Sequence, residues 1–558
     1  MKIKKANLPN DLIAGLTFAL VNIPQSMAHA LLASVNPVFG LYTLMLATPV
    51  GALFAGAVFM NVSTTSALAV AAGDTLKTYP DSSRVTALVT LVVMIGIFQI
   101  VLGLLRLGWL TRFIPYSVMT GFMTGVAAMI IIGQLGDFTG YYSSYSGKIA
   151  QLADLILNLD SIQWATLAIG LITLLVIYFL AKTRVSKFSL VIALVVSSGL
   201  AILMNELFET SIKIVKEISE VPATLPKLML PDLSLIVPLI VPAIAIGIIG
   251  LVQGAGVSQT FPNPDGKFSD VSRDFLGQGA ANLAAGLFSG IPAGGSSSGT
   301  ALMVSAGARS RWGNIFGGIL VALVVLLFAD LVELVAMPAL AALVIVAGIQ
   351  MVNLDAIKTV WYTNTVSRTI MLVTFGSTLV MPLQYAVFLG VALSILLFVL
   401  QQSNTIRVVE WVVGETGWPV ETPAPKKLKS SQVTVLFIYG NLFYAAASTL
   451  ENNLPSVEKA SRPVVILLLR GYEDVGSTVS EVLRRYTQAL QANQGKLIMA
   501  GVSPALLAQL QRTGLLELIG KENIYLTTKN IGEAGNAAYR AATDWLASFP
   551  NEQGASDS

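Results

Sequence analysis

Long stretches of the chain contain no Asp, Glu, Lys or Arg. The first runs from Leu12 to Gly73, 62 residues without a charged side chain. A helix needs about 20 apolar residues to cross a bilayer, and an ionised group at the bilayer centre costs about 3 kcal/mol or more. The pattern therefore predicts a polytopic α-helical membrane protein. Further charge-free runs are 85–104, 114–136, 161–181, 188–205, 233–264, 275–308, 312–329, 334–354 and 369–406.

About fourteen spans account for these runs, some of them short and interrupted by Gly. With that count the basic loops all fall on one side, which the excess of Lys and Arg marks as cytoplasmic. Both termini are then cytoplasmic and the protein lies in the cytoplasmic membrane. No short apolar core with a cleavage site follows the charged start, so the amino-terminal segment is interpreted as retained. The basic loops are Lys2–Lys5, 106–112, 182–187, 309–311 and 358–368.

The composition changes after Ile406, and it predicts four regions. Residues 1–402 form the transmembrane domain. Residues 403–431 are polar, with Pro419, Pro423 and Pro425, and read as a linker. Residues 432–548 alternate β-rich and helical runs, which predicts a soluble α/β domain with parallel strands. The tail, residues 549–558, is expected to be disordered.

Composition excludes several classes of function. Hydrophobic residues make up 54% of the chain and charged residues 12%, about half the usual charged share of a soluble protein. The chain has no Cys and one His, which argues against thiol chemistry, Cys/His zinc sites and His-based catalysis. The net charge of +3 is too small to indicate nucleic acid binding. No acid pair, metal cluster or activated nucleophile is visible in the spans, so we expect neither an enzyme nor a cofactor.

An internal repeat indicates where a site lies. Residues 65–73 (TSALAVAAG) and 299–307 (GTALMVSAG) agree at five of nine positions, and a hydroxyl cluster precedes each. Chance similarity between Ala-rich segments is one explanation. Two halves of a transporter built from inverted repeats are the better one.

Each repeat segment is too short to be a full span, which suggests a half-helix that starts inside the membrane. Such a helix exposes its first N–H groups, and its dipole adds about +0.5 charge there. Ser and Thr hydroxyls add neutral donors, so two facing starts form an anion site without Lys or Arg. A helix-packing seam rich in small residues is the alternative interpretation.

Ordered motifs in the chain resemble the SulP sulfate permease family, whose animal relatives are sulfate, chloride and bicarbonate exchangers. The carboxyl-terminal region resembles the family's STAS domain, related to anti-sigma-factor antagonists. The resemblance covers nearly the whole chain. Its motifs are DLIAGLT (11–17), IPQSMAHA (23–30), residues 40–42, VMTGF (118–122), residues 133–135, GQGAAN (277–282), residues 290–292 and residues 307–309, with 464–474 and 497–516 in the STAS-like region.

The resemblance implies seven plus seven inverted spans, arranged as a core and a gate domain that move against each other. The anion then lies between the half-helices of spans 3 and 10, beside spans 1 and 8. A homodimer is also implied. The substrate-binding residues mapped in this way are Gln25, Thr65, Ser66, Gln253, Ser298, Gly299 and Thr300.

This sequence departs from the family at two of these positions. Many relatives have a carboxylate on span 8 for proton or cation coupling, where this chain has Gln253. Glutamine cannot hold a negative charge, which puts coupling to a proton or sodium in doubt. Many relatives also have an Arg at the start of span 10, where this chain has Gly299. The site is then nearly neutral, which suits exchange of small anions or weak binding.

Two residues of the first span admit two interpretations each. His29, four residues after Gln25, is either a proton-linked group near the site or a neutral histidine bonded to a backbone carbonyl. Pro24 marks either a helix break that frees carbonyl groups or a tolerated kink.

In the STAS-like region, residues 470–477 occupy the place of a family loop whose Ser is phosphorylated in the antagonist relatives. The corresponding hydroxyl is displaced here to Ser477 or Thr478. Ser at a helix start is most often an N-cap, and regulation by phosphate is the second interpretation.

The sequence therefore predicts a secondary transporter of small inorganic anions. Sulfate is the first candidate and bicarbonate the second, on the resemblance alone. An uncoupled channel or exchanger of the same fold stays open, as does a membrane sensor that signals through the STAS-like domain without moving substrate.

Overall fold

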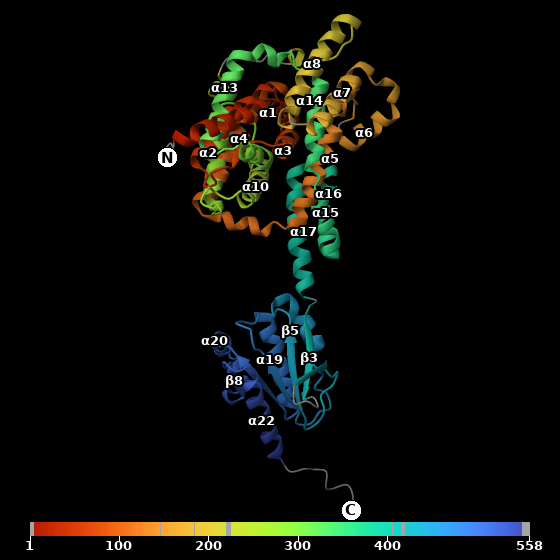
Figure 1. Ribbon diagram of the computed structural model, residues 1–558. Helices are drawn as coiled ribbons and strands as arrows, with labels where there is room; N and C mark the ends of the chain where they lie inside the picture. The colour runs from red at the N-terminus through yellow and green to blue at the C-terminus, as the bar shows by residue number, and fades with distance from the viewer. Residues whose placement is uncertain are drawn as a thin grey trace, which may run out of the picture. The chain divides into compact units, whose positions relative to one another are not determined.

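The computed structural model describes residues 5–145, 147–183, 185–218, 225–403, 405–413 and 419–549. The chain divides into two compact units, Met1–Ser394 and Ile395–Ser558, which are described separately below. The first is almost entirely helical and the second is α/β (Figure 1).

The described part of the chain has eight helical stretches that are long and apolar enough to span a membrane. The chain is thus a multi-pass membrane protein, while the fourteen-span count stays a prediction. The eight stretches contain α4 (Asp81–Leu104), α5 (Tyr116–Thr139), α7 (Trp164–Ala181), α8 (Ser189–Phe208), α10 (Ile236–Thr260), α13 (Trp312–Glu333), α14 (Met337–Met351) with α15 (Leu354–Thr363), and α17 (Leu383–Ser403).

Further helices fill the unit between these stretches. α1 (Leu8–Leu32) continues through Pro24, so this proline does not break the helix. The other helices are α2 (Val38–Phe54), α3 (Ser66–Leu76), α6 (Lys148–Leu157), α9 (Val215–Ile218), α11 (Val271–Leu287), α12 (Ser297–Ser305) and α16 (Thr365–Val380).

The helices pack in two groups, as Figure 1 shows. In one group α11 packs on α2 and α4, and α13 packs on α1 and α2. In the other, α5 packs on α14 and α16, and α7 packs on α8 and α14. Small residues let the backbones approach: a Cβ on Gly40 of α2 would lie 1.9 Å from the backbone oxygen of Ser26 on α1. This division fits the core and gate arrangement that the family resemblance implies.

Two short strands link the repeated segments. β1 (Asn61–Thr64) leads into α3, and β2 (Ala293–Ser296) leads into α12. The strands pair antiparallel, with Asn61 opposite Ser296 and Thr64 opposite Ala293. All eight residues are buried. The ladder therefore supplies hydrogen bonds to backbone N–H and C=O groups, which the hydrocarbon interior of a bilayer cannot provide.

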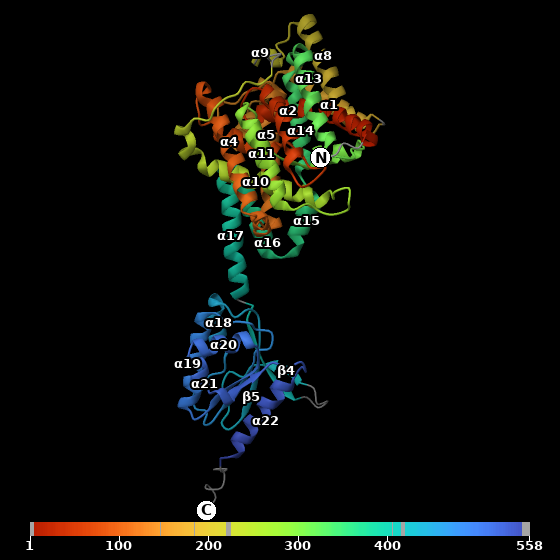
Figure 2. The same cartoon turned by 90° about the vertical axis from the view of Figure 1, so that its left-hand side faces the viewer.

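The second unit is built on a six-stranded sheet with the order β4-β3-β5-β6-β7-β8. Strands β5 (Val433–Tyr439), β6 (Val464–Leu468), β7 (Lys496–Val502) and β8 (Ile524–Leu526) pair in parallel. One face packs on α18 (Ala447–Asn453), α19 (Ser477–Ala492), α20 (Pro504–Arg512) and α21 (Leu515–Ile519), and the other on α22 (Glu533–Ala547), as in Figure 2.

The sheet extends into the region that the sequence analysis assigns to a linker. β3 (Arg407–Val413) pairs antiparallel with β5, and β4 (Pro419–Pro423) pairs antiparallel with β3. The structure corrects the linker interpretation for these two segments. Proline is tolerated in β4 because β4 is an edge strand, where missing donors face outward. The predicted disordered tail lies outside the described residues, apart from Phe549.

Candidate functional site

The start of α3 is held by hydrogen bonds within the protein. Thr65 is the N-cap, and its hydroxyl accepts from the backbone N–H of Leu68. The same hydroxyl donates to Oε1 of Gln253 on α10 at 3.2 Å. The structure thus brings Thr65 and Gln253 together, as the sequence analysis predicts for neighbours in one site.

His29 of α1 also contacts the start of α3. Its Nδ1 lies 2.8 Å from the hydroxyl of Thr64, and its Nε2 lies 2.9 Å from the hydroxyl of Ser66. All three side chains are buried. These two hydroxyls, and not a backbone carbonyl, are the partners of His29, so Ser66 has a hydrogen-bond partner inside the protein.

The start of α12 is organised differently. The N-cap is Ser296, whose hydroxyl accepts from the N–H of Gly299 at 3.0 Å. The Thr300 hydroxyl donates to the backbone oxygen of Ser296 at 2.7 Å and accepts from the N–H of Asn61 at 2.9 Å. The structure therefore differs from the expectation at Thr300, because its proton is already used inside the protein. Ser298 is exposed.

A cavity of about 290 Å³ opens beside Ser298. Gln25 of α1 is half-buried and lines the same cavity, so two predicted site residues converge there. None of the described side chains that line it is charged. The lining residues are Val21, Asn22, Gln25, Ile177, Ala181, Ser186, Ser189, Leu190, Ser298, Leu302 and Gln350.

The N-terminus of α12 supplies donors to this space. The backbone N–H of Gly299 is capped, but that of Ser298, which lines the cavity, precedes the first N–H that an α-helix can satisfy internally. Together with the Ser298 hydroxyl and the Gln25 amide it forms a neutral, donor-rich surface. Such a surface suits a small anion. Because its groups are neutral, it can release the anion without any change in their protonation.

Polar residues of α11 position β2 and therefore α12. The Asn282 side chain accepts from the N–H of Ala293 and donates to its carbonyl, both at 2.8 Å. Oε1 of Gln278 accepts from the N–H of Gly295 at 3.1 Å. Both residues belong to the GQGAAN motif, to which the sequence analysis assigns no role. Buried amides in an apolar run were the signal that points to them.

Two buried carboxylates fasten the loops around the strands. Asp11 of α1 accepts from the backbone N–H groups of Arg309 and Ser310, at 2.7 and 3.0 Å, in the loop after α12. Asp274 of α11 accepts from the N–H of Ala57, just before β1, at 2.8 Å. Each carboxylate ties one half of the repeat to the other, which keeps the two helix starts in register.

The regulatory candidates of the second unit lie at the start of α19. The N-cap is Gly476 without a side-chain cap, so the N-cap interpretation of Ser477 is not what the structure shows. Ser477 and Thr478 are the first two helical residues, and both are exposed. Their phosphorylation stays a prediction.

The apolar helices define a multi-pass membrane protein, and the names of its relatives define a transporter rather than an enzyme. The model of the sulfate permease family matches residues 8–374, and that of the STAS domain matches residues 424–531. The chain belongs to the sulfate permease family.

Named relatives extend over most of the chain. The bicarbonate transporter BicA of a Picosynechococcus strain is 27% identical over 415 residues, 72% of each chain. Sulfate transporter 4.1 of Arabidopsis thaliana, a chloroplastic protein, is 24% identical over 535 residues, 92% of this chain and 78% of that one. The structure of murine solute carrier 26 family member A9, an anion transporter in the inward-facing state, shares the fold. Its TM-score is 0.84 at 18% identity, and the match covers 98% of this chain and 92% of that chain.

Proposed function

We propose that this protein is a secondary transporter of small inorganic anions in the cytoplasmic membrane, with sulfate as its first substrate and bicarbonate as its second. The observation that carries the proposal is the convergence of Gln25 and Ser298 on one cavity at the start of α12. The described lining is uncharged, so the anion is held by hydrogen-bond donors and the helix dipole.

The relatives support the choice of anion. Sulfate transporter 4.1 and BicA carry sulfate and bicarbonate in their names. Both anions are small oxyanions that accept several hydrogen bonds, which matches the Ser298 hydroxyl, the Gln25 amide and free backbone donors. Thr65 and Gln253, the hydrogen-bonded pair that joins α3 to α10, do not line this cavity.

Coupling is the finer part of the proposal. Gln253 stands where many relatives have a carboxylate, and here it accepts a hydrogen bond from Thr65. A neutral amide cannot bind a proton or sodium as a carboxylate does. Anion exchange is therefore the transport mode that we propose. We also propose that both termini are cytoplasmic and that the protein is a homodimer.

The first test is uptake into proteoliposomes of purified protein. Labelled sulfate and labelled bicarbonate are compared with and without proton and sodium gradients and with internal anion. We expect saturable sulfate uptake that internal anion accelerates and that neither gradient drives. Binding of sulfate without any flux would overturn the transport proposal in favour of a sensor.

The second test is Ser298→Ala. Loss of one hydroxyl that binds an anion costs about 1–2 kcal/mol, which is a 5- to 30-fold increase in KM for sulfate. The matched control is Ser297→Ala, since Ser297 is the adjacent exposed serine and does not line the cavity. Equal effects of the two substitutions would move the site away from Ser298.

A further inference from the structure

A second cavity, of about 440 Å³, lies at the other ends of the helices that form the site. Leu31 and Leu32 of α1 line it, six and seven residues beyond Gln25, which is about 10 Å along the helix. Asp74 lines it from α3, nine residues beyond Thr65 and about 13 Å further along. With the amino end of α1 cytoplasmic, this cavity faces the outside of the cell.

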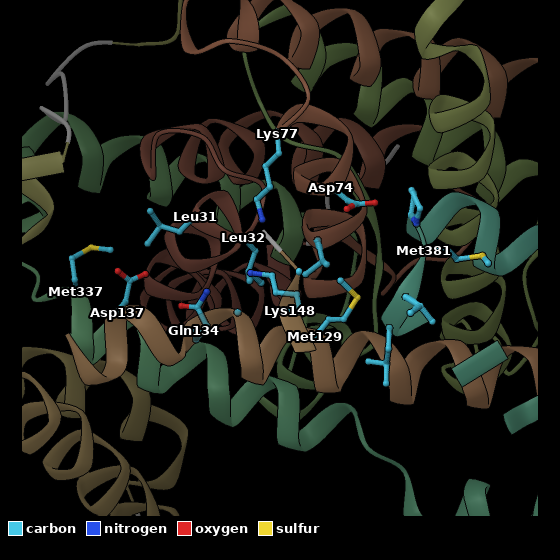
Figure 3. A pocket seen from close by; sticks show the side chains of 16 residues that line it. Leu31, Leu32, Asp74, Lys77, Met129, Gln134, Asp137, Lys148, Met337 and Met381 are labelled. Atoms are coloured by element: carbon cyan, nitrogen blue, oxygen red, sulfur yellow. The ribbon is translucent and has the colours of Figure 1, made fainter. Parts of the chain in front are cut away.

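Two lysines project into this cavity from different helices. Lys77 follows the last residue of α3, and Lys148 is the first residue of α6. Figure 3 shows both side-chain nitrogens turned toward the middle of the cavity, with Gln134 and Asp137 near one end and Asp74 on the other side. The lysines come from the two helix groups, Lys77 from the group of α1 and Lys148 from that of α5.

The carboxylates in the cavity are bound to neutral donors. Asp74 accepts from the backbone N–H of Leu383 at 3.2 Å, and Asp137 accepts from the Tyr142 hydroxyl at 2.8 Å. Among the described residues, no carboxylate lies within 4.0 Å of either lysine nitrogen. The two ammonium groups are therefore open to another anion.

The charged side chains that line the cavity are Lys77, Lys148, Asp74 and Asp137, and a third lysine lies behind Asp137. Lys213 lies over the Tyr142 ring, 4.3 Å from its centroid, and its charge acts on Asp137. The lining itself holds two ammonium groups and two carboxylates, and the charge of Lys213 offsets that of Asp137 from outside the cavity. Lys148 has one hydrogen bond, to the neutral amide oxygen of Gln151 at 3.2 Å. A low-dielectric wall around like charges raises the local concentration of a counter-ion.

We propose that Lys77 and Lys148 form a capture site for a small inorganic oxyanion on the outer side of the transport domain, from which the anion passes to the site at α12. The proposal rests on the proposed function, because it takes the same class of anion. Gln134 lines the cavity and adds an amide donor. Because the lysines belong to opposite helix groups, the anion bridges the groups while it is bound.

The test is the KM for external sulfate, measured by uptake into intact cells, beside the KM for internal sulfate, measured by efflux. Lys77→Gln and Lys148→Gln are each expected to raise the external KM roughly threefold to tenfold and to leave the internal KM and kcat unchanged. Lys148→Arg keeps the charge, so its external KM is expected to equal that of the unmodified protein.

The matched control is Lys216→Gln on α9. It removes the same charge from an exposed lysine that pairs with Glu333 at 3.9 Å and does not line the cavity. An unchanged external KM in both cavity variants would overturn the capture site. So would equal changes of both KM values or a change of kcat alone, which is the pattern of a contact that only locks the two helix groups.

The two proposals fail in different ways. If the unmodified protein moves no sulfate in either direction, the proposed function fails. If it moves sulfate and the cavity variants match the control, only the capture site fails. The amount of each single variant in the membrane is measured, and its KM is compared with that of the control. If one of the two lysine variants fails to reach the membrane, the other still tests the capture site.

Discussion

The starts of α3 and α12 come from similar sequences and each follows a short strand, yet their hydroxyl groups have different partners. At α3, Thr65 bonds to Gln253 and Ser66 bonds to His29. At α12, Thr300 bonds within the ladder, but Ser298 faces a cavity. The repeat therefore sets the backbone geometry of both helix starts, while the neighbouring helices decide which of them is open to a ligand.

The other ends of the two helices differ as well. α3 ends at a charged cavity with Asp74 and Lys77, whereas α12 ends at Ser305 and the uncharged residues Ala306 and Gly307. The start of α12 is thus open to a ligand, whereas the end of α3 carries charged side chains. An inverted repeat can in this way provide two different binding sites for one anion.

The largest expected effect is on stability, and it distinguishes Gly73 from Gly307, the last residues of the two repeated segments. A methyl group at Gly73 would lie 2.2 Å from the backbone oxygen of Leu32, which no side-chain rotation can relieve, so Gly73→Ala should cost about 3 kcal/mol or more. Gly307 has a φ of +94° and open space around it, so Gly307→Ala should cost only about 1–2 kcal/mol. Thermal unfolding of the two purified variants measures the difference. Equal losses would mean that the halves pack alike.

A smaller effect separates the two hydroxyl clusters. Ser66→Ala leaves a nitrogen of buried His29 without its partner, which should lower the free energy of unfolding by about 1–3 kcal/mol. The KM for sulfate should change less than in Ser298→Ala, whose effect on unfolding should be small because that side chain is exposed. Measurements of unfolding and uptake on both variants test whether Ser66→Ala mainly affects stability and Ser298→Ala mainly affects KM. A larger KM change in Ser66→Ala would place the anion at α3.

The smallest effect is a pH dependence at the charged end of α3. The pKa of Lys148 is lowered to about 8, mainly by burial and also by the charge of Lys77, while Asp137 and Asp74 oppose the shift. The amine is charged below this pKa and neutral above it, so the external KM for sulfate should rise about twofold or more from about pH 7 to about pH 9. Sulfate keeps its charge across this range. Lys148→Arg should remove the dependence, because arginine stays protonated.

The sequence was sufficient for most elements, while the place of the site stays a prediction. The charge-free runs indicate the spans, and the nine-residue repeat indicates α3 and α12, because both signals are local. In the second unit, the alternation of β-rich and helical runs predicted over residues 432–548 is present as the parallel strands β5 to β8 with α19 and α20.

Partners across the fold were beyond the sequence. The pairing of His29 with Ser66, and of Thr300 with Asn61, depends on how α1 and β1 pack, which no local pattern encodes. The second cavity was missed for the same reason, since Lys77 and Lys148 are 71 positions apart in the chain. β3 and β4 were missed because Pro and Lys dominate the composition around them.

The uncharged lining of the cavity at α12 has an electrical consequence. A protein with no fixed counter-charge at its binding site moves the whole charge of its cargo when loaded and none when it returns empty. Each elementary charge that crosses the membrane potential is worth about 2.3 kcal/mol per 100 mV. The voltage across the membrane then acts directly on the loaded step, and an exchange of anions of unequal valence becomes a current.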